Sequence, residues 1–365
     1  MVGRASRKWS ETYDRVPGDV IKIQTDIAQK VASALAIALT GAAVVLGGTT
    51  NAAAQNLVLK AIAVANKGDR EDLQTAQSLL DGALEIDPNY AEAYVQKARV
   101  LSDFAGNFAG AEELPVYRAD ASSNARRALA IAPSLASAHN ALAEIHRVSL
   151  QFKDADREYR RALELAPHDA ATLRDTARFA SQLGRRSEAL RLVDQAIALD
   201  PLNPLSYTSR LWVLTANRQF AEGVDYARTI EARWPKFVPW LEVAFCLINL
   251  GRLDEARQAA SKLDPTDSSG GRPIAEALID ASAGRTTEAE RNLAMVRRDF
   301  GDAASYQYAQ IYSVLGDKAQ ALSELERAWD IRDSGLLWLK VDPTFDPLRD
   351  KPRFRALVER LDFPS

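Results

Sequence analysis

Two arginines at helical spacing are the side chains best suited to bind a ligand by charge. Arg174 and Arg178 are four residues apart, so in a helix they lie one turn apart on the same face. A guanidinium group binds a carboxylate through paired, charge-assisted hydrogen bonds. The pair therefore indicates a site for an acidic segment or a chain-terminal carboxylate. The alternative is that both side chains are only solvated.

Residues that usually hold metals or act as nucleophiles are scarce. The one cysteine, Cys246, excludes an internal disulfide and any zinc site built from several cysteines. We expect it to be a buried, inert thiol. His139 and His146 are seven residues apart on one helix face, where a place in the core is a simpler interpretation than metal binding. We therefore expect no metal site.

The sequence shows no recognisable catalytic motif. It has no glycine-rich phosphate loop after a strand, no paired-histidine zinc motif and no nucleophile elbow. Carboxylates are numerous, but none is singled out by a catalytic partner. We expect that the protein is not an enzyme and that it has no cofactor.

Composition is that of a folded protein without a strongly basic surface. The 365 residues are 47% hydrophobic and 26% charged, and the net charge is −3. That charge provides no general attraction for nucleic acid, so we expect no nucleic-acid partner. Length alone suggests two or three globular domains, but an array of repeats grows without a single core.

The elements that position the arginines belong to two adjoining units of equal length, 136–169 and 170–203. A fixed period of about 34 residues is typical of a solenoid of helical hairpins. Small residues recur where two helices approach closely, and a proline follows each second helix and ends it. The corresponding pairs are Ala143 and Ala177, Ala155 and Ala189, Ala162 and Ala196, and Pro167 and Pro201.

This pattern resembles the tetratricopeptide repeat (TPR) family. The consensus slots of that family are filled in the first unit by His139, Leu142-Ala143, Ala155, Ala162 and Pro167. The resemblance implies an all-α fold, a right-handed superhelix of helical hairpins. It also implies a protein or peptide partner bound on the concave face.

About eight TPR-like repeats are expected over residues 57–333. The second is eleven residues longer than the period, and we expect the extra residues between its helices, within 104–120. Residues 334–365 are expected to cap the array. The repeats are 57–90, 91–135, 136–169, 170–203, 204–237, 238–267, 270–301 and 302–333.

The TPR resemblance also implies which side chains face the groove. In that family, fixed positions of the first helix line the concave surface. Together with Glu144, the positions carried over to this sequence are Arg99, Asn140, Arg147, Arg174, Arg178, Gln182, Thr208 and Trp212. The arginines among them are expected to hold an acidic segment.

The first 48 residues resemble the end of the TolB-like α/β domain that precedes TPR arrays in certain bacterial signalling proteins. The run WSETYDR from Trp9, and Ile23-Gln24 with Ile27-Ala28, carry this resemblance. The segment from Trp338 to Phe354 resembles the terminus of the same family. The rest of the TolB-like domain is missing, so the chain resembles the C-terminal piece of a longer architecture.

Residues 31–48 are uncharged and just long enough to be considered as a membrane span. Small residues fill eleven of the eighteen positions and favour insertion little. We prefer a buried helix followed by a short apolar connection, and we expect a cytoplasmic protein. A membrane anchor through these residues is the alternative.

Taken together, the sequence predicts a non-enzymatic scaffold that binds a peptide or protein in a concave TPR groove. The competing hypothesis is a regulatory C-terminal region of a bacterial nucleotide cyclase or transcriptional regulator whose effector domain is absent from this chain.

Overall fold

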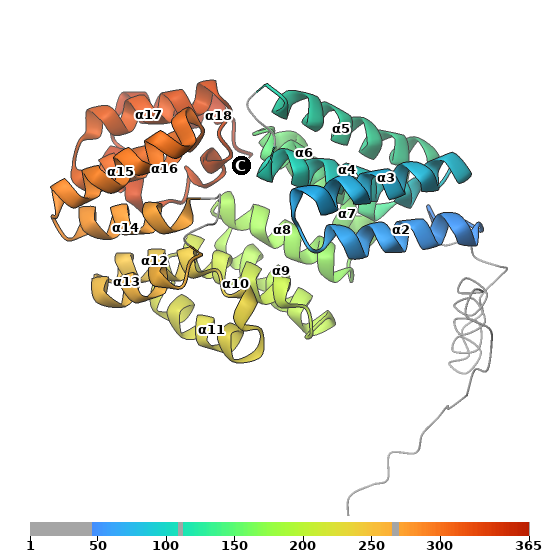
Figure 1. Ribbon diagram of the computed structural model, residues 1–365, viewed down its shortest axis with the longest axis horizontal. Coiled ribbons are helices and arrows are strands. Elements are labelled where there is room, and N and C mark those ends of the chain that lie inside the picture. Colours follow the sequence, from blue (N-terminus) through green and yellow to red (C-terminus); the bar gives the residue numbers. More distant parts are fainter. Residues whose placement is uncertain (1–45, 109–111, 265–269, 365) are drawn as a thin grey trace, which may run out of the picture. The chain divides into compact units, whose positions relative to one another are not determined.

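The computed structural model describes residues 46–108, 112–264 and 270–364, and every regular element in these ranges is helical (Figure 1). The all-α expectation is confirmed. The segment expected to end a TolB-like domain lies almost wholly outside the described residues, as does most of the 31–48 stretch. None of the helices within the described ranges is long and apolar enough to cross a membrane.

The chain divides into two compact units, residues 1–141 and 142–365, and the division falls inside α6. The helices of the first unit are α2 (Ala52–Ala65), α3 (Arg70–Ile86), α4 (Ala91–Asn107), α5 (Leu114–Ile131) and the start of α6 (Ala136–Val148). Those of the second continue with α7 (Phe152–Leu165), α8 (Ala170–Gln182), α9 (Arg186–Leu199), α10 (Pro204–Ala216), α11 (Phe220–Arg233), α12 (Trp240–Asn249), α13 (Leu253–Ser261), α14 (Gly271–Ser282), α15 (Thr286–Phe300), α16 (Ser305–Leu315) and α17 (Lys318–Asp330).

Successive helices pair as hairpins, because small side chains let their backbones approach. Ala155, Ala162, Ala189 and Ala196 are all fully buried on second helices. The turn between the helices repeats as well. Leu150, Gly184 and Arg218 occupy the same position of three successive hairpins, and all three have a positive φ, of 59°, 76° and 65°. Only glycine adopts this backbone region without strain, so the fold imposes the same turn even where the sequence lacks glycine.

One expectation about the first unit is wrong. The extra residues of the second repeat do not form a long loop within 104–120. Instead α4 extends to Asn107 and α5 begins at Leu114, so both helices are lengthened. Phe104 lies against Phe108 and Tyr117, with ring centroids 5.8 and 4.7 Å apart. These aromatic contacts give the added turns a buried face, which favours helix over loop.

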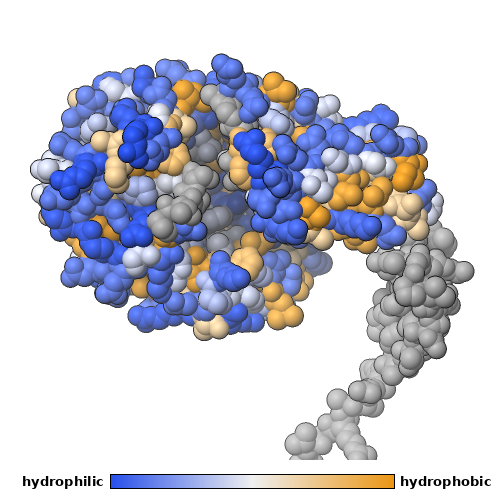
Figure 2. All heavy atoms as spheres, viewed as in Figure 1, coloured by the Kyte–Doolittle hydropathy of each residue, from blue (hydrophilic) through white to orange (hydrophobic). Residues whose placement is uncertain are grey.

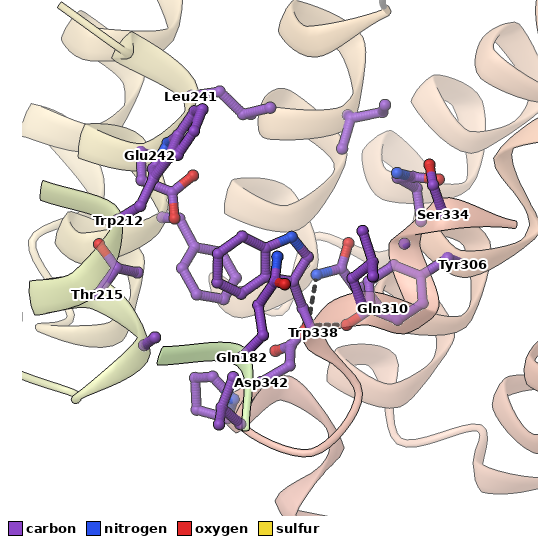
Figure 3. Close-up of a pocket in the computed structure, with 18 of the residues that line it drawn as sticks. Gln182, Trp212, Thr215, Leu241, Glu242, Tyr306, Gln310, Ser334, Trp338 and Asp342 are labelled. Atoms are coloured by element: carbon purple, nitrogen blue, oxygen red, sulfur yellow. Dashed lines mark hydrogen bonds between the residues drawn. The ribbon is translucent and has the colours of Figure 1, made fainter. Parts of the chain in front are cut away.

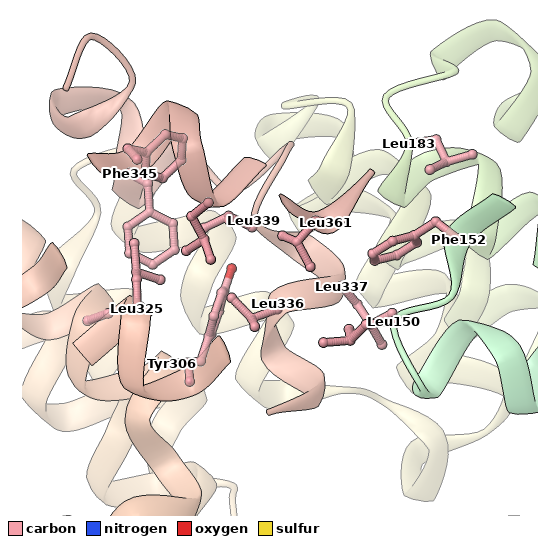
Figure 4. Close-up of a cluster of buried hydrophobic side chains, with 14 of the residues drawn as sticks. Leu150, Phe152, Leu183, Tyr306, Leu325, Leu336, Leu337, Leu339, Phe345 and Leu361 are labelled. Atoms are coloured by element: carbon pink, nitrogen blue, oxygen red, sulfur yellow. The ribbon is translucent and has the colours of Figure 1, made fainter. Parts of the chain in front are cut away.

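The C-terminal segment does more than cover the end of the array. It contains η3 (Ser334–Trp338), η4 (Pro343–Leu348) and α18 (Pro352–Leu361). Its apolar side chains share one buried cluster with Leu150, Phe152 and Leu183 from the first hairpins of the same unit (Figure 4). Arg218 also donates two hydrogen bonds, of 2.6 and 2.7 Å, to the carboxylate of Asp346. The segment therefore joins the last hairpins of the second unit to its first ones.

Candidate binding cavity

A cavity of about 430 Å³ lies within the second unit (Figure 3). The first helix of each of six successive hairpins lines it, and so does the C-terminal segment. The helices are α6, α8, α10, α12, α14 and α16. The lining mixes aromatic, aliphatic and charged side chains, which is typical of ligand sites in this size range.

One wall of the cavity carries two arginines that share a carboxylate. Glu144 accepts hydrogen bonds from Arg147 at 2.7 and 2.9 Å, from Arg178 at 2.8 Å and from the Tyr159 hydroxyl at 2.6 Å. Arg147 also donates to Gln182 across 3.4 Å. The guanidinium of Arg178 lies 5.5 Å from the ring centre of Trp212. The network fixes α6, α7 and α8 relative to one another.

Burial and charge act in opposite directions on Glu144. Burial alone would raise the pKa of its carboxyl group, but Arg147 and Arg178 outweigh that effect and hold the pKa of Glu144 well below its usual value. The pKa of Arg178 is raised in turn, since the adjacent carboxylates of Glu144 and Asp175 more than offset its desolvation. Glu144 therefore stays ionised, and its charge neutralises much of the arginine charge on this wall.

Two carboxylates lie elsewhere on the lining. Asp342 accepts hydrogen bonds from the Tyr306 hydroxyl at 2.8 Å and from Gln310 at 2.7 Å, and its other oxygen accepts from Thr344. Glu242 on α12 makes no hydrogen bond or ion pair with any residue that the structure describes. Burial, with a smaller contribution from the charge of Asp342, raises the pKa of Glu242 to about 7.

Groups that could act as metal ligands or nucleophiles have structural partners instead. The Nδ1 atom of His146 lies 2.5 Å from Gln151, and the Nε2 atom of His139 lies 3.1 Å from the carbonyl of Pro133. Cys246 is fully buried beside the Thr215 hydroxyl, and burial raises the pKa of its thiol to about 12. In the described ranges, no group of three histidine, cysteine or acidic residues is arranged to hold a metal.

No protein-family model matches the chain, and no curated protein matches it significantly. Among solved structures, the human IFIT1 dimer with PPP-AAAA matches with a TM-score of 0.55 at 15% identity, over 85% of this chain and 78% of that one. At this identity the match shows the fold. This chain is a solenoid of TPR-like hairpins. That statement rests on the match and on the repeated hairpins seen here.

Two further solved structures match with lower TM-scores. PilF from Pseudomonas aeruginosa has a TM-score of 0.41 at 22% identity, over 57% of this chain and 90% of that one. A tetratricopeptide repeat protein from Parabacteroides merdae has a TM-score of 0.42 at 12% identity, over 86% and 100%. The TolB-like resemblance stays a prediction, because the residues that carry most of it lie outside the described ranges.

The cavity brings together half of the groove residues that the TPR resemblance implied. Arg147, Arg178, Gln182 and Trp212 line it. Arg174 does not, and its guanidinium pairs with Asp175 at 2.9 Å. Of the four arginines expected to face the groove, two therefore line the cavity, and these two share Glu144.

The remaining expected residues lie away from the cavity lining. Thr208 donates a hydrogen bond to the carbonyl of Phe237 at 3.0 Å. Arg99 and Asn140 belong to the first unit, and Asn140 is only 2% exposed. A partner-binding role for these residues stays a prediction.

Several lining residues were missed although the repeat period could have named them. Glu242 stands one full period after Thr208, at the same position of the next TPR-like hairpin, and Tyr306 and Gln310 line the cavity from α16 in the same way. The resemblance named groove residues only up to the fifth repeat, before the period loosens. Trp338 and Asp342 belong to the C-terminal segment, which has no repeat position, so no such signal exists for them.

Proposed function

We propose that this protein is a non-enzymatic interaction scaffold that binds a segment of a partner protein in the cavity of its second unit. The observation that carries the proposal is the cavity itself, which the first helices of six hairpins line. A volume of about 430 Å³ suits a few side chains rather than a folded domain. The partner would therefore present a short extended or terminal segment.

The lining supplies the kinds of contact on which protein interfaces depend most. Trp212, Phe245, Tyr306 and Trp338 provide aromatic surface, and such residues contribute disproportionately to binding energy. Gln182, Gln307 and Gln310 add hydrogen-bonding groups. Large aromatic area with a few fixed polar groups favours recognition over chemistry, because the lining presents no nucleophile beside a general base.

The IFIT1 match raises a nucleic-acid ligand as an alternative, since that protein was solved with PPP-AAAA. The present cavity suits such a ligand poorly. Its two lining arginines already bind Glu144, and its lining includes the carboxylates of Glu242 and Asp342. We therefore retain a protein partner in the proposal. The proposal also keeps the cytoplasmic location expected from the sequence. The alternative function is that of a regulatory region of a longer signalling protein.

Filling the cavity tests this proposal. Gln307 lines the cavity from α16 and is only partly buried, so Gln307→Trp should occupy the space without disturbing the core. We expect the recovery of cavity-dependent partners from cell lysate to fall about tenfold or more, which corresponds to a loss of about 1.4 kcal/mol or more. Quantitative mass spectrometry of the captured proteins measures this.

The matched control is Gln320→Trp on α17, where the glutamine is exposed and does not line the cavity. It should capture the same partners as the parent protein. Equal capture by the Gln307→Trp variant, with an unchanged Tm, would show that partners bind elsewhere.

A further inference from the structure

The charged side chains in and behind the cavity wall are unevenly paired. Arg147 and Arg178 share Glu144, and Arg174 pairs with Asp175. Those pairs leave one positive charge in excess on that side. The carboxylates of Glu242 and Asp342 oppose it, and neither forms an ion pair with a described residue. The described part of the lining thus holds two acidic side chains, Glu242 and Asp342, without a cationic partner, and burial raises the pKa of both.

Glu242 is the carboxylate that lacks hydrogen bonds as well as a counter-charge. Asp342 is stabilised by four hydrogen bonds from neutral donors, whereas Glu242 has none among the described residues. The titratable or charged groups that line the cavity besides Glu242 are Asp342, Tyr306, Arg147 and Arg178, and of these only Asp342 affects the pKa of Glu242. Behind the lining, the charge of Glu242 helps to raise the pKa of Cys246. The side chain of Glu242 is only partly exposed, and a carboxylate that loses water without gaining a partner costs stability. Such groups are concentrated at functional sites.

The position of Glu242 in its helix does not account for this arrangement. It is the third residue of α12, where the helix dipole favours negative charge. Glu288 occupies the same position of α15, but its side chain is exposed to water. Glu242 differs because it lines the cavity and is only partly exposed.

Aromatic and aliphatic surface lies beside this carboxylate. Figure 3 shows Glu242, Leu241 and Trp212 on one side of the cavity, Tyr306, Gln310 and Ser334 on the other, and Trp338 between them. The ring of Trp212 already has Arg178 at 5.5 Å. No cation of the described part of the chain lies over Trp338, so its face is available for a cation–π contact. Leu241 and Leu337 would pack against an alkyl stem.

We infer that the cavity binds an alkylammonium group, presented as a lysine side chain of the partner segment, with its charge on Glu242 and against Trp338. This inference rests on the proposed function and names the chemistry of the partner. It replaces the acidic segment that the arginines predicted from sequence, because both arginines already donate hydrogen bonds to Glu144, although the Nε atom of Arg178 has no partner among the described residues. An acidic ligand becomes an outcome of the test.

The test is a calorimetric titration of the full chain at pH 8 with four defined probes. They are acetyl-Gly-Lys-Gly-amide, its neutral norleucine counterpart, its glutamate counterpart, and n-butylamine. We expect the lysine peptide to bind at least tenfold more tightly than the norleucine and glutamate peptides. Glu242→Gln should weaken its binding about ten- to a hundredfold, the loss expected for a charge-assisted bond. Glu288→Gln, the matched control, should bind it as the parent does.

A thermal readout shows whether the variant folds. Because Glu242 is mostly ionised at pH 8, Glu242→Gln should raise the Tm by a few degrees while it weakens binding of the lysine peptide. Tighter binding of the glutamate peptide, no binding of the lysine peptide at millimolar concentration, or unchanged binding by Glu242→Gln would each overturn the inference. If n-butylamine bound as tightly as the lysine peptide, the result would contradict a lysine side chain as the source of the alkylammonium group. Capture by the Gln307→Trp variant decides the proposed function independently of these results.

Discussion

Phe345→Ala should lower the free energy of unfolding by about 3–5 kcal/mol, the usual cost of removing a fully buried phenylalanine. Phe345 lies in η4 with no exposed surface, 5.3 Å from the ring of Tyr306 and 6.2 Å from that of Phe354. It packs in the cluster that joins the C-terminal segment to the first hairpins of the second unit. Chemical denaturation measures the loss.

The same substitution at an exposed phenylalanine provides the control. Phe237 is 44% exposed in η1 (Pro235–Phe237), so Phe237→Ala should change stability by no more than about 0.5 kcal/mol. If both variants unfold at the denaturant concentration of the parent, the C-terminal segment is not part of the folded core, and its place in the cavity wall is wrong.

Glu144→Gln should lower the free energy of unfolding by about 3 kcal/mol. The change leaves Arg147 and Arg178 without their shared carboxylate, and breaking a buried ion pair typically costs 3–5 kcal/mol. We expect the lower end because 21% of the Glu144 side chain is exposed. Glu164→Gln is the control, and it should change the free energy of unfolding much less. Glu164 forms an exposed pair with Arg161, and its side chain is 65% exposed.

At acid pH, the parent and the Glu144→Gln variant should differ less in their free energy of unfolding. The folded-state pKa of Glu144 is depressed, so the stability that this group adds is complete above its unfolded value of 4.5. It is lost as the pH falls below that value towards the lower folded pKa. Unfolding measured at pH 7 and at pH 3.5 should show the larger difference at pH 7. An equal difference at both pH values would contradict the ionised state of Glu144.

The hairpins follow from sequence because their causes are local. Small residues such as Ala162 and Ala196 recur once in each repeat, and both are buried as their spacing requires. The turn at Gly184 is visible in sequence, but the equivalent turns at Leu150 and Arg218 carry no glycine. In those hairpins the packing of the helices imposes the turn.

The candidate site could be predicted from the sequence only in part, because it depends on contacts between residues far apart in the chain. Arg218 and Asp346 are 128 residues apart, and no periodicity links them. Arg147 and Arg178 line the cavity and Arg174 does not, and the sequence indicates Glu144 only as another groove residue, not as the counter-ion that the two lining arginines share. The surface gives no clearer signal, since the face drawn in Figure 2 is mainly hydrophilic, with apolar residues in small groups.

The most direct test of the central claim is to map where a partner touches the protein. A photo-crosslinking residue, p-benzoylphenylalanine, would replace Ser334, which is exposed and lines the cavity, or Ser261, which is exposed on α13 and does not. The account predicts that partners captured by the parent crosslink to the Ser334 position and not to the Ser261 position. Crosslinks at position 261 with none at position 334 would contradict it.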